Sequence, residues 1–227
     1  MILVSRDAER LEEVAAELRG TFNVMVEVLP ADLSADLSHV EARLAASDRP
    51  VDVLINNAGF TVGKPFVGGD VAAEQRLIDV MVTAVMRLTH VALPGMVERG
   101  RGAVVNVGSV AGLVPRGTYS AAKAWVRAFT TGLRPQVAGT GVRIMLLAPG
   151  FTRTEFHERA AMSTSSLPRF LWHDADAVVT RALRDLDRGV PVSVPGVVYK
   201  AASTVLPRLP LRVLIGAGTV NASRPWQ

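Results

Sequence analysis

Three residues of this 227-residue chain, Ser109, Tyr119 and Lys123, form a pattern that suits proton transfer. Tyr119 and Lys123 are four positions apart in a stretch with helical spacing, so they share one face of the predicted helix. Ser109 ends an apolar run that starts at Gly102, which predicts a buried parallel strand ending in a hydroxyl. The pattern therefore predicts a phenol and an ammonium group just beyond a strand end that carries a serine.

A phenol has a pKa near 10, so it is a poor acid or base at neutral pH unless a neighbouring charge shifts it. Bringing the pKa of Tyr119 to about 7 requires about 4 kcal/mol of preferential stabilisation of its anion. The Lys123 ammonium is the neighbouring cation that would supply it. A surface tyrosine stacked beside a lysine is the second interpretation, and the Tyr119–Lys123 pentapeptide alone does not decide between them.

Strands and helices are predicted to alternate along the whole chain. Apolar runs predict strands at 1–4, 24–29, 50–56, 102–109, 142–148 and 190–194. Helical patterns lie at about 8–20, 34–47, 70–98, 119–130 and 175–187. Strands that alternate with helices of this length predict an α/β fold, with a parallel sheet flanked by helices on both faces.

Polar or turn residues close four of the predicted strands: Asp32, Asn57, Ser109 and the pair at 149–150. Tyr119 follows one of these strand ends. The carboxyl ends of parallel strands share one edge of the sheet, and ligands bind beyond that edge. These residues are therefore expected to surround one ligand site.

The composition excludes several classes of function. The chain has no cysteine, which excludes disulfides, zinc thiolates and a cysteine nucleophile. Its four histidines, at 39, 90, 157 and 173, lack metal-ligand spacing, so no metal site is predicted. The net charge of +4 is spread along the chain without a block of like charges, which argues against a nucleic-acid partner. Neither a signal peptide nor an unbroken transmembrane run is recognisable, which predicts a cytoplasmic protein.

The chain resembles the short-chain dehydrogenase/reductases over nearly its whole length. The segments that carry the resemblance, in order, are Asp32-Leu33, Asn56-Asn57-Ala58-Gly59, Ser109, Tyr119-Ser-Ala-Ala-Lys123 and Pro149-Gly-Phe-Thr-Arg-Thr154. The resemblance implies one Rossmann-like, doubly wound domain over residues 1–227. It also implies hydride transfer between a nicotinamide cofactor and a small-molecule carbonyl or alcohol, in a homodimer or homotetramer.

The family's pattern gives each matched residue a role. Tyr119 is implied to be the general acid in reduction, while Lys123 lowers the tyrosine pKa and binds the nicotinamide ribose. Ser109 is implied to hold the substrate oxygen, because a developing alkoxide needs both a proton and a hydrogen-bond donor. The implied remainder of the cofactor site comprises Asp32 and Leu33 beside the adenine, Asn57, Ala58 and Gly59 on the adenosine side, and Pro149, Gly150, Thr152 and Thr154 near the carboxamide and pyrophosphate. For Asn56 and Asn57, a strand-end turn that only pins the sheet is the alternative.

Arg6 follows the first predicted strand, in the region that usually faces the adenosine 2′ position. An acidic residue there would bind a free 2′-hydroxyl, whereas an arginine suits a 2′-phosphate. Arg6 therefore favours NADP over NAD, and a solvated arginine beside the helix cap Asp7 is the alternative.

Two departures from the family's pattern put activity in doubt. Family members begin with a strand, a Gly-rich turn and a helix, and this chain is expected to begin at the family's second strand. The missing strand would lie in the middle of the sheet, and the missing turn would hold the pyrophosphate at a helix N-terminus. Met81 stands where the family places an asparagine that helps to relay protons through a water. A thioether cannot replace that amide, although Met81 would be an ordinary core residue.

The last quarter of the chain is the least informative. Residues 151–173 are expected to form the substrate-side loop, whose apolar side chains favour an apolar substrate (Phe156, Met162, Leu167, Phe170, Leu171 and Trp172). The apolar segment at 197–218 is interrupted by charged residues and prolines, so it cannot span a bilayer as one helix. Packing against the domain or a second subunit is favoured for it over contact with a membrane surface.

Two hypotheses from different classes follow. The first is an NADP-dependent carbonyl reductase or alcohol dehydrogenase, and it is favoured by the presence of Ser109, Tyr119 and Lys123. The second is a truncated, catalytically silent relative that serves as a binding or oligomer partner. It is favoured by Met81 and by the absence of the Gly-rich turn.

Overall fold

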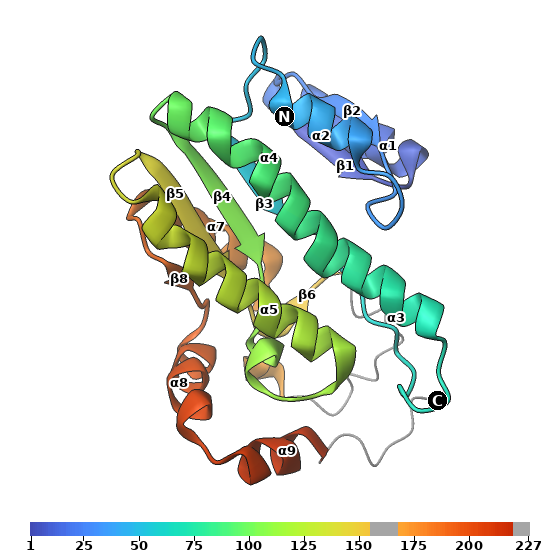
Figure 1. Cartoon of the computed structure of the whole chain (residues 1–227), viewed down its shortest axis with the longest axis vertical. Helices are drawn as coiled ribbons and strands as arrows, with labels where there is room; N and C mark the ends of the chain where they lie inside the picture. The colour runs from blue at the N-terminus through green and yellow to red at the C-terminus, as the bar shows by residue number, and fades with distance from the viewer. Residues whose placement is uncertain (155–167, 220–227) are drawn as a thin grey trace.

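The computed structural model describes residues 1–154 and 168–219, and strands and helices alternate along it (Figure 1). The strands are β1 (Ile2–Ser5), β2 (Glu27–Pro30), β3 (Val53–Asn56), β4 (Gly102–Val107), β5 (Val142–Leu147), β6 (Thr152–Arg153), β7 (His173–Asp174) and β8 (Val192–Ser193). The α-helices are α1 (Ala8–Phe22), α2 (Ser38–Ala45), α3 (Val71–Ile78), α4 (Ala84–Glu98), α5 (Gly117–Leu133), α7 (Ala175–Asp187), α8 (Val197–Val205) and α9 (Leu211–Thr219). Single turns of π or 3₁₀ type are η1 (Asp79–Thr83), η2 (Val110–Leu113), η3 (Arg134–Val137), η4 (Arg169–Leu171) and η5 (Leu206–Arg208).

The parallel sheet is divided into separate parts. Strands β3, β4, β5 and β8 pair in that order, while β1 pairs with β2 alone and β6 pairs with β7. All of these pairs are parallel. Parallel strands need crossover connections, and helices supply them here. The predicted Rossmann-like α/β architecture is confirmed, and within the described residues no ladder joins β1 or β2 to β3.

One apolar core nevertheless spans the β1–β2 pair and the larger sheet. Val4 of β1 and Leu29 of β2 pack against the buried cluster that contains Leu54, Leu88 and Val104. Helices α2 and α4 contact each other over this face, and α4 and α5 run side by side across the larger sheet (Figure 1). Side-chain packing, rather than backbone hydrogen bonding, therefore holds β1 and β2 to the larger sheet.

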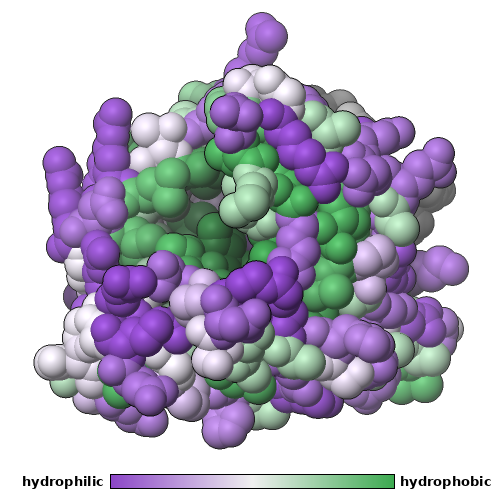
Figure 2. All heavy atoms as spheres, turned by 90° about the horizontal axis from the view of Figure 1, so that it is seen from above, coloured by the Kyte–Doolittle hydropathy of each residue, from purple (hydrophilic) through white to green (hydrophobic). Residues whose placement is uncertain are grey.

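The opposite face of the larger sheet is only partly covered. Ala182 of α7 packs on Val105 and Met145 of the central strands. The side chains of β3 alternate between the two faces, and Val53 and Ile55 remain 48% and 54% exposed. Seen from above, apolar residues line a hollow in the molecular surface (Figure 2).

Residues 71–98 form one continuous helix that includes α3, η1 and α4, close to the predicted range of 70–98. By length and composition alone, this helix is apolar enough to cross a membrane. Here it lies against the domain, where Leu77, Leu88 and Met96 are buried. Its middle turn, η1, is π-helical and carries Met81. Such turns are frequent at functional sites.

Candidate active site

Ser109, Tyr119 and Lys123 lie together just beyond the carboxyl end of β4. The Ser109 Oγ accepts a hydrogen bond from the Ala111 amide at 3.1 Å, which starts the short helix η2. That helix lies so close to α5 that a Cβ on Gly112 would be 2.7 Å from the Lys123 carbonyl carbon. Glycine at position 112 therefore allows the turn to bring Ser109 against α5.

The Tyr119 phenol is hydrogen-bonded to the Ser109 side chain. Burial raises the pKa of Tyr119, and the hydrogen bond from Ser109 opposes this only in part. The predicted lowering of the Tyr119 pKa is therefore wrong for this chain, because burial disfavours the charged phenolate. At neutral pH the phenol stays protonated, which is the form that can donate a proton.

Lys123 is buried beneath Tyr119. Its Nζ donates a hydrogen bond to the Val107 carbonyl oxygen at 2.6 Å and lies 5.8 Å from the Tyr119 ring centroid. Burial lowers the pKa of Lys123 to about 8. Most of the lysine therefore remains protonated at pH 7, with its charge directed toward the end of β4.

Met81 lies in the apolar cluster against which Tyr119 packs, together with Leu77 and Ala122. A Cβ on Gly59 would be 3.4 Å from the Met81 Sδ and 3.7 Å from the Lys123 Nζ, so Gly59 lies close to both side chains. The interpretation of Met81 as a buried core residue is confirmed, since it is 1% exposed. The Met81 thioether occupies a position close to Lys123, where the amide of an asparagine could have formed hydrogen bonds.

Asn56 belongs to a buried hydrogen-bond network. Its Nδ2 donates to the Thr89 Oγ1 at 3.1 Å and to the Asn106 Oδ1 at 2.8 Å. The Asn106 Nδ2 then donates to the Thr130 Oγ1 at 3.0 Å. The network joins β3, β4, α4 and α5 directly beneath the site, so the interpretation that Asn56 pins the sheet is confirmed. The roles of Asn106, Thr89 and Thr130 were not predicted, although polar residues inside apolar runs are the signal for such networks.

The predicted adenosine-side residues lie at the ends of β1 and β2. The Asp32 Oδ1 accepts hydrogen bonds from the Ser34 amide at 2.9 Å and the Ser34 hydroxyl at 2.7 Å. These bonds lower the pKa of Asp32, and the positive charge of Arg6 contributes a smaller lowering. Arg6 itself is exposed, whereas Leu33 packs against the core. The structure thus brings Arg6 and Asp32 within electrostatic reach of each other.

The other predicted cofactor residues follow the strand ends in two groups. Asn57 and Ala58 are exposed after β3, and Gly59 is partly covered by Met81. The second group follows β5, with Pro149 and Gly150 partly buried, Thr152 donating its hydroxyl to the Gly150 carbonyl at 3.2 Å, and Thr154 exposed.

Gly150 leaves room for the Tyr199 ring of α8, a contact that was not predicted from the sequence. A Cβ at this position would lie 2.1 Å from the Tyr199 ring. The Tyr199 hydroxyl also accepts a hydrogen bond from the Phe151 amide at 3.2 Å and donates one to the Leu171 carbonyl at 2.8 Å. A glycine is therefore needed here for α8 to dock, whatever its role toward a cofactor. Of the predicted apolar lining, Phe156, Met162 and Leu167 lie outside the described residues.

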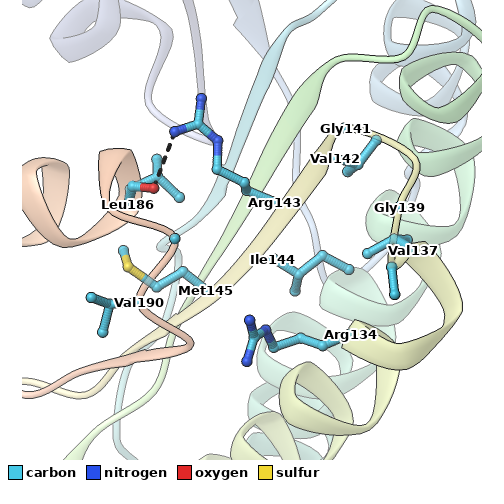
Figure 3. Close-up of a pocket in the computed structure, with 12 residues that line it drawn as sticks. Arg134, Val137, Gly139, Gly141, Val142, Arg143, Ile144, Met145, Leu186 and Val190 are labelled. Carbon is cyan, nitrogen blue, oxygen red and sulfur yellow. Dashed lines mark hydrogen bonds between the residues drawn. The ribbon is translucent and has the colours of Figure 1, made fainter.

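A pocket of about 370 Å³ lies away from this site, around the first residues of β5 (Figure 3). Arg134, Ile144 and Val190 contribute to its wall. The neighbouring Arg143 donates to the Leu186 carbonyl at 3.2 Å, at the end of α7. None of its lining residues belongs to the predicted site, which lies at the other ends of the strands.

The family assignment rests on the match of most of the chain to one family model. The model for short chain dehydrogenases matches residues 1–164. The chain belongs to this family.

This short-chain dehydrogenase is 39% identical over 161 residues to sulfoacetaldehyde reductase 2 of Chromohalobacter salexigens. It is 38% identical over 161 residues to an NADP-dependent 3-hydroxy acid dehydrogenase of Salmonella typhi. Each alignment covers 69% of this chain and 64% of the relative, so the chain spans less than two thirds of the length of these relatives.

Solved structures of the family agree with the fold. A short-chain dehydrogenase from Sphingobium yanoikuyae in complex with NADPH has a TM-score of 0.81 and 35% identity, covering 92% of this chain and 86% of that one. The bulky-bulky ketone specific alcohol dehydrogenase from Comamonas testosteroni has a TM-score of 0.76 and 29% identity, with coverages of 92% and 84%.

Proposed function

We propose that this short-chain dehydrogenase is an oxidoreductase that uses NADPH to reduce a carbonyl compound, or runs the reverse reaction on the alcohol. The observation that carries the proposal is the hydrogen-bonded pair of Ser109 and Tyr119, with the Lys123 ammonium beside it. Two neighbouring hydroxyl groups can bind one carbonyl oxygen, and the protonated phenol can deliver a proton to it.

When bound, NADPH supplies the hydride to the carbonyl carbon. The substrate oxygen gains negative charge at that moment, and hydrogen bonds from Ser109 and Tyr119 stabilise it. Tyr119 then gives its proton to this oxygen, which completes the alcohol and leaves a phenolate. The Lys123 ammonium stabilises the phenolate until a proton from solvent restores the phenol.

The residues at the strand ends fit a dinucleotide along this edge of the sheet. Arg6 is an exposed cation at the end of β1 and suits a 2′-phosphate, which supports NADP as the cofactor over NAD. The NADPH complex of the Sphingobium yanoikuyae relative and the NADP-dependent relative from Salmonella typhi support the same cofactor. Asn57 after β3 and Thr154 after β6 are exposed polar residues along this edge, and Asp32 after β2 is half-buried.

The proposed substrate is an apolar ketone or aldehyde. Phe170 is 69% exposed, and Trp172 lies against Phe151 with ring centroids 5.5 Å apart, so aromatic surface is available near the strand ends. The bulky ketones named for the Comamonas testosteroni relative are of the same chemical kind. We further propose a cytoplasmic location and a homodimer or homotetramer. The apolar side chains of Met86 and Val97, exposed on one face of α4, support the oligomer.

The test is NADPH oxidation followed at 340 nm with a panel of aliphatic and aromatic ketones and aldehydes. Turnover that depends on Tyr119 supports the reductase. Met81 favours the second candidate, a catalytically silent binding or oligomer partner. With a thioether at position 81, the only hydrogen-bond partner of Lys123 among the described residues is the Val107 carbonyl. NADPH binding without turnover of any substrate in the panel would support this candidate instead.

A further inference from the structure

The C-terminal arm, defined as α8, η5 and α9 (residues 197–219), has a surface that the proposed reaction does not use. In Figure 1 the arm projects from the body of the molecule beyond the carboxyl end of β4, on the side where α5 begins. Helix α8 contacts η2, the turn that follows Ser109. The arm therefore borders the candidate active site.

One face of α8 fixes the arm to the body. Tyr199 is buried, with hydrogen bonds to Phe151 and Leu171 and an edge-on contact with the His173 ring at 5.4 Å. Successive residues of a helix turn by about 100°, so Val197 points away from Tyr199, toward the outside. The arm is thus held by one anchored face and presents the other.

The outer face is apolar. Val197 and Val205 of α8 are 86% and 53% exposed, and Leu211 and Ile215 of α9 are 62% and 47% exposed. Leu211 and Ile215 are four residues apart and share one face of their helix. Exposed apolar side chains are common singly, but a series along two consecutive helices marks an interaction surface.

The arm also carries charge of one sign. Five of the chain's 25 Lys and Arg residues follow Asp187, whereas none of its 21 Asp and Glu residues does. Lys200, Arg208 and Arg212 lie in the arm itself and are exposed. Residues 1–187 have nearly balanced charge, so the excess of positive charge follows Asp187, and three of its five basic residues lie in the arm.

We propose that the arm docks on an anionic lipid bilayer, with its apolar face in the headgroup region and its basic residues on the acidic lipids. Amphipathic helices with this combination lie in the plane of a membrane surface. A second copy of the chain is a poorer partner. A two-fold contact through the arm would place two positively charged surfaces against each other, with no acidic residue to pair with them. A negatively charged bilayer satisfies the apolar and the basic residues together.

Docking would hold the side of the molecule next to η2 at the membrane. Leu211 lines a cavity of about 520 Å³ together with Gly112, Ser120 and Ala121, next to η2. An apolar substrate dissolved in the bilayer would then reach this side of the molecule without crossing water.

The experiment is sedimentation of the full chain with vesicles in 0.1 M salt. We expect binding to vesicles of phosphatidylcholine with 30% phosphatidylserine and little binding to phosphatidylcholine alone. Raising the salt to 0.5 M should release most of the protein, because it shortens the range of the attraction. This comparison uses the unaltered chain and does not depend on any variant folding.

Two variants test the two components of the surface. Val197→Asp with Ile215→Asp should weaken vesicle binding about tenfold or more, since both side chains lose their place in the headgroup region. Arg208→Glu with Arg212→Glu should weaken it at least 25-fold, about fivefold for each positive charge lost near the membrane. Matched controls at other exposed positions are Met25→Asp, and Arg101→Glu with Arg184→Glu; both should bind as the unaltered chain does.

Equal sedimentation with neutral and anionic vesicles would overturn the proposal, as would an equal loss of binding in the arm variants and their controls. Light scattering supplies a further check. If the arm variants convert an oligomer into a monomer while vesicle binding is unchanged, the arm is a subunit interface and the membrane proposal is wrong. None of these readouts requires turnover, so they are independent of the proposed reductase activity.

Discussion

The two ends of the proposed NADPH site are built in different ways. At the end of β4, Lys123 is buried, bonded to the backbone of Val107 and packed beneath Tyr119. Just after the end of β1, Arg6 is exposed, next to a strand whose only partner among the described strands is β2. Buried groups at the first end have their ionisation set by desolvation, whereas the exposed groups at the second act through charge in water. The proposed proton transfer thus takes place where packing is dense, and the proposed choice of cofactor is made where packing is loose.

The largest effect is expected at the densely packed end. Tyr119→Phe should lower kcat by about 10²-fold or more, because the proton donor is gone, while NADPH affinity should change little. Stopped-flow turnover and fluorescence titration measure the two separately. The chain's other tyrosine provides the control, since Tyr199→Phe removes a hydroxyl outside the proposed chemistry. Wild-type turnover by Tyr119→Phe would refute the assignment of Tyr119 as the acid.

Lys123→Met should also abolish most turnover and weaken NADPH binding, yet it should stabilise the fold. The folded-state pKa of Lys123 is about 8, below its usual 10.5, so at pH 7 the folded protein holds a buried cation at a cost of about 3 kcal/mol. The unfolded chain binds more protons between these two values, so wild-type stability rises with pH there. The stability gained by the variant should therefore fall to about 1 kcal/mol at pH 9.5. Urea unfolding at both pH values measures this, and a gain that did not change with pH would exclude titration of Lys123 as its cause.

The buried network distinguishes Asn56 from its neighbour Asn57. Asn56→Ala leaves the Asn106 and Thr89 side chains without their donor, which should cost about 1–3 kcal/mol of folding free energy. Asn57→Ala, one residue later and exposed, should change stability by less than about 0.5 kcal/mol. Equal destabilisation by the two substitutions would mean that the network does not hold the two strands together.

At the loosely packed end, Arg6→Ala should reduce the preference for NADPH over NADH about tenfold, with stability unchanged. The control is Arg10→Ala, which removes an exposed arginine already paired with Glu13 at 2.8 Å. Fluorescence titration with both nucleotides gives the ratio. An unchanged ratio in Arg6→Ala would remove the basis for choosing NADP.

The smallest effect is expected at Met81. Met81→Asn places an amide next to the Lys123 Nζ, where it can hold a water for proton return, so turnover should rise a few-fold near neutral pH. Met81→Leu is the control that preserves the apolar cluster without adding a polar group. A lower Tm with no gain in rate would show that the helix has repacked around the thioether, and would favour the silent-partner function.

Local pattern predicted the strand ends and the order of the matched segments, because a parallel sheet brings its carboxyl ends to one edge. It did not predict the direction of the Tyr119 pKa shift. A sequence shows the nearby lysine but not the burial that raises the pKa of Tyr119. It also missed the contact of Tyr199 with Gly150 and the network around Asn106, because both join residues far apart in the chain. Such contacts depend on how complete elements pack together.

The divided sheet has a consequence for dynamics. Since no ladder among the described strands joins β1 and β2 to β3, the unit from β1 to β2 can open without breaking any described strand pairing of the larger sheet. Backbone amides of β1 and β2 should then exchange with deuterium faster than those of β4 and β5, which lie inside a four-stranded ladder. A dinucleotide bound along the whole edge would have to order this unit. Part of its binding free energy would offset that ordering, and its arrival should slow exchange in β1 and β2 more than in β4.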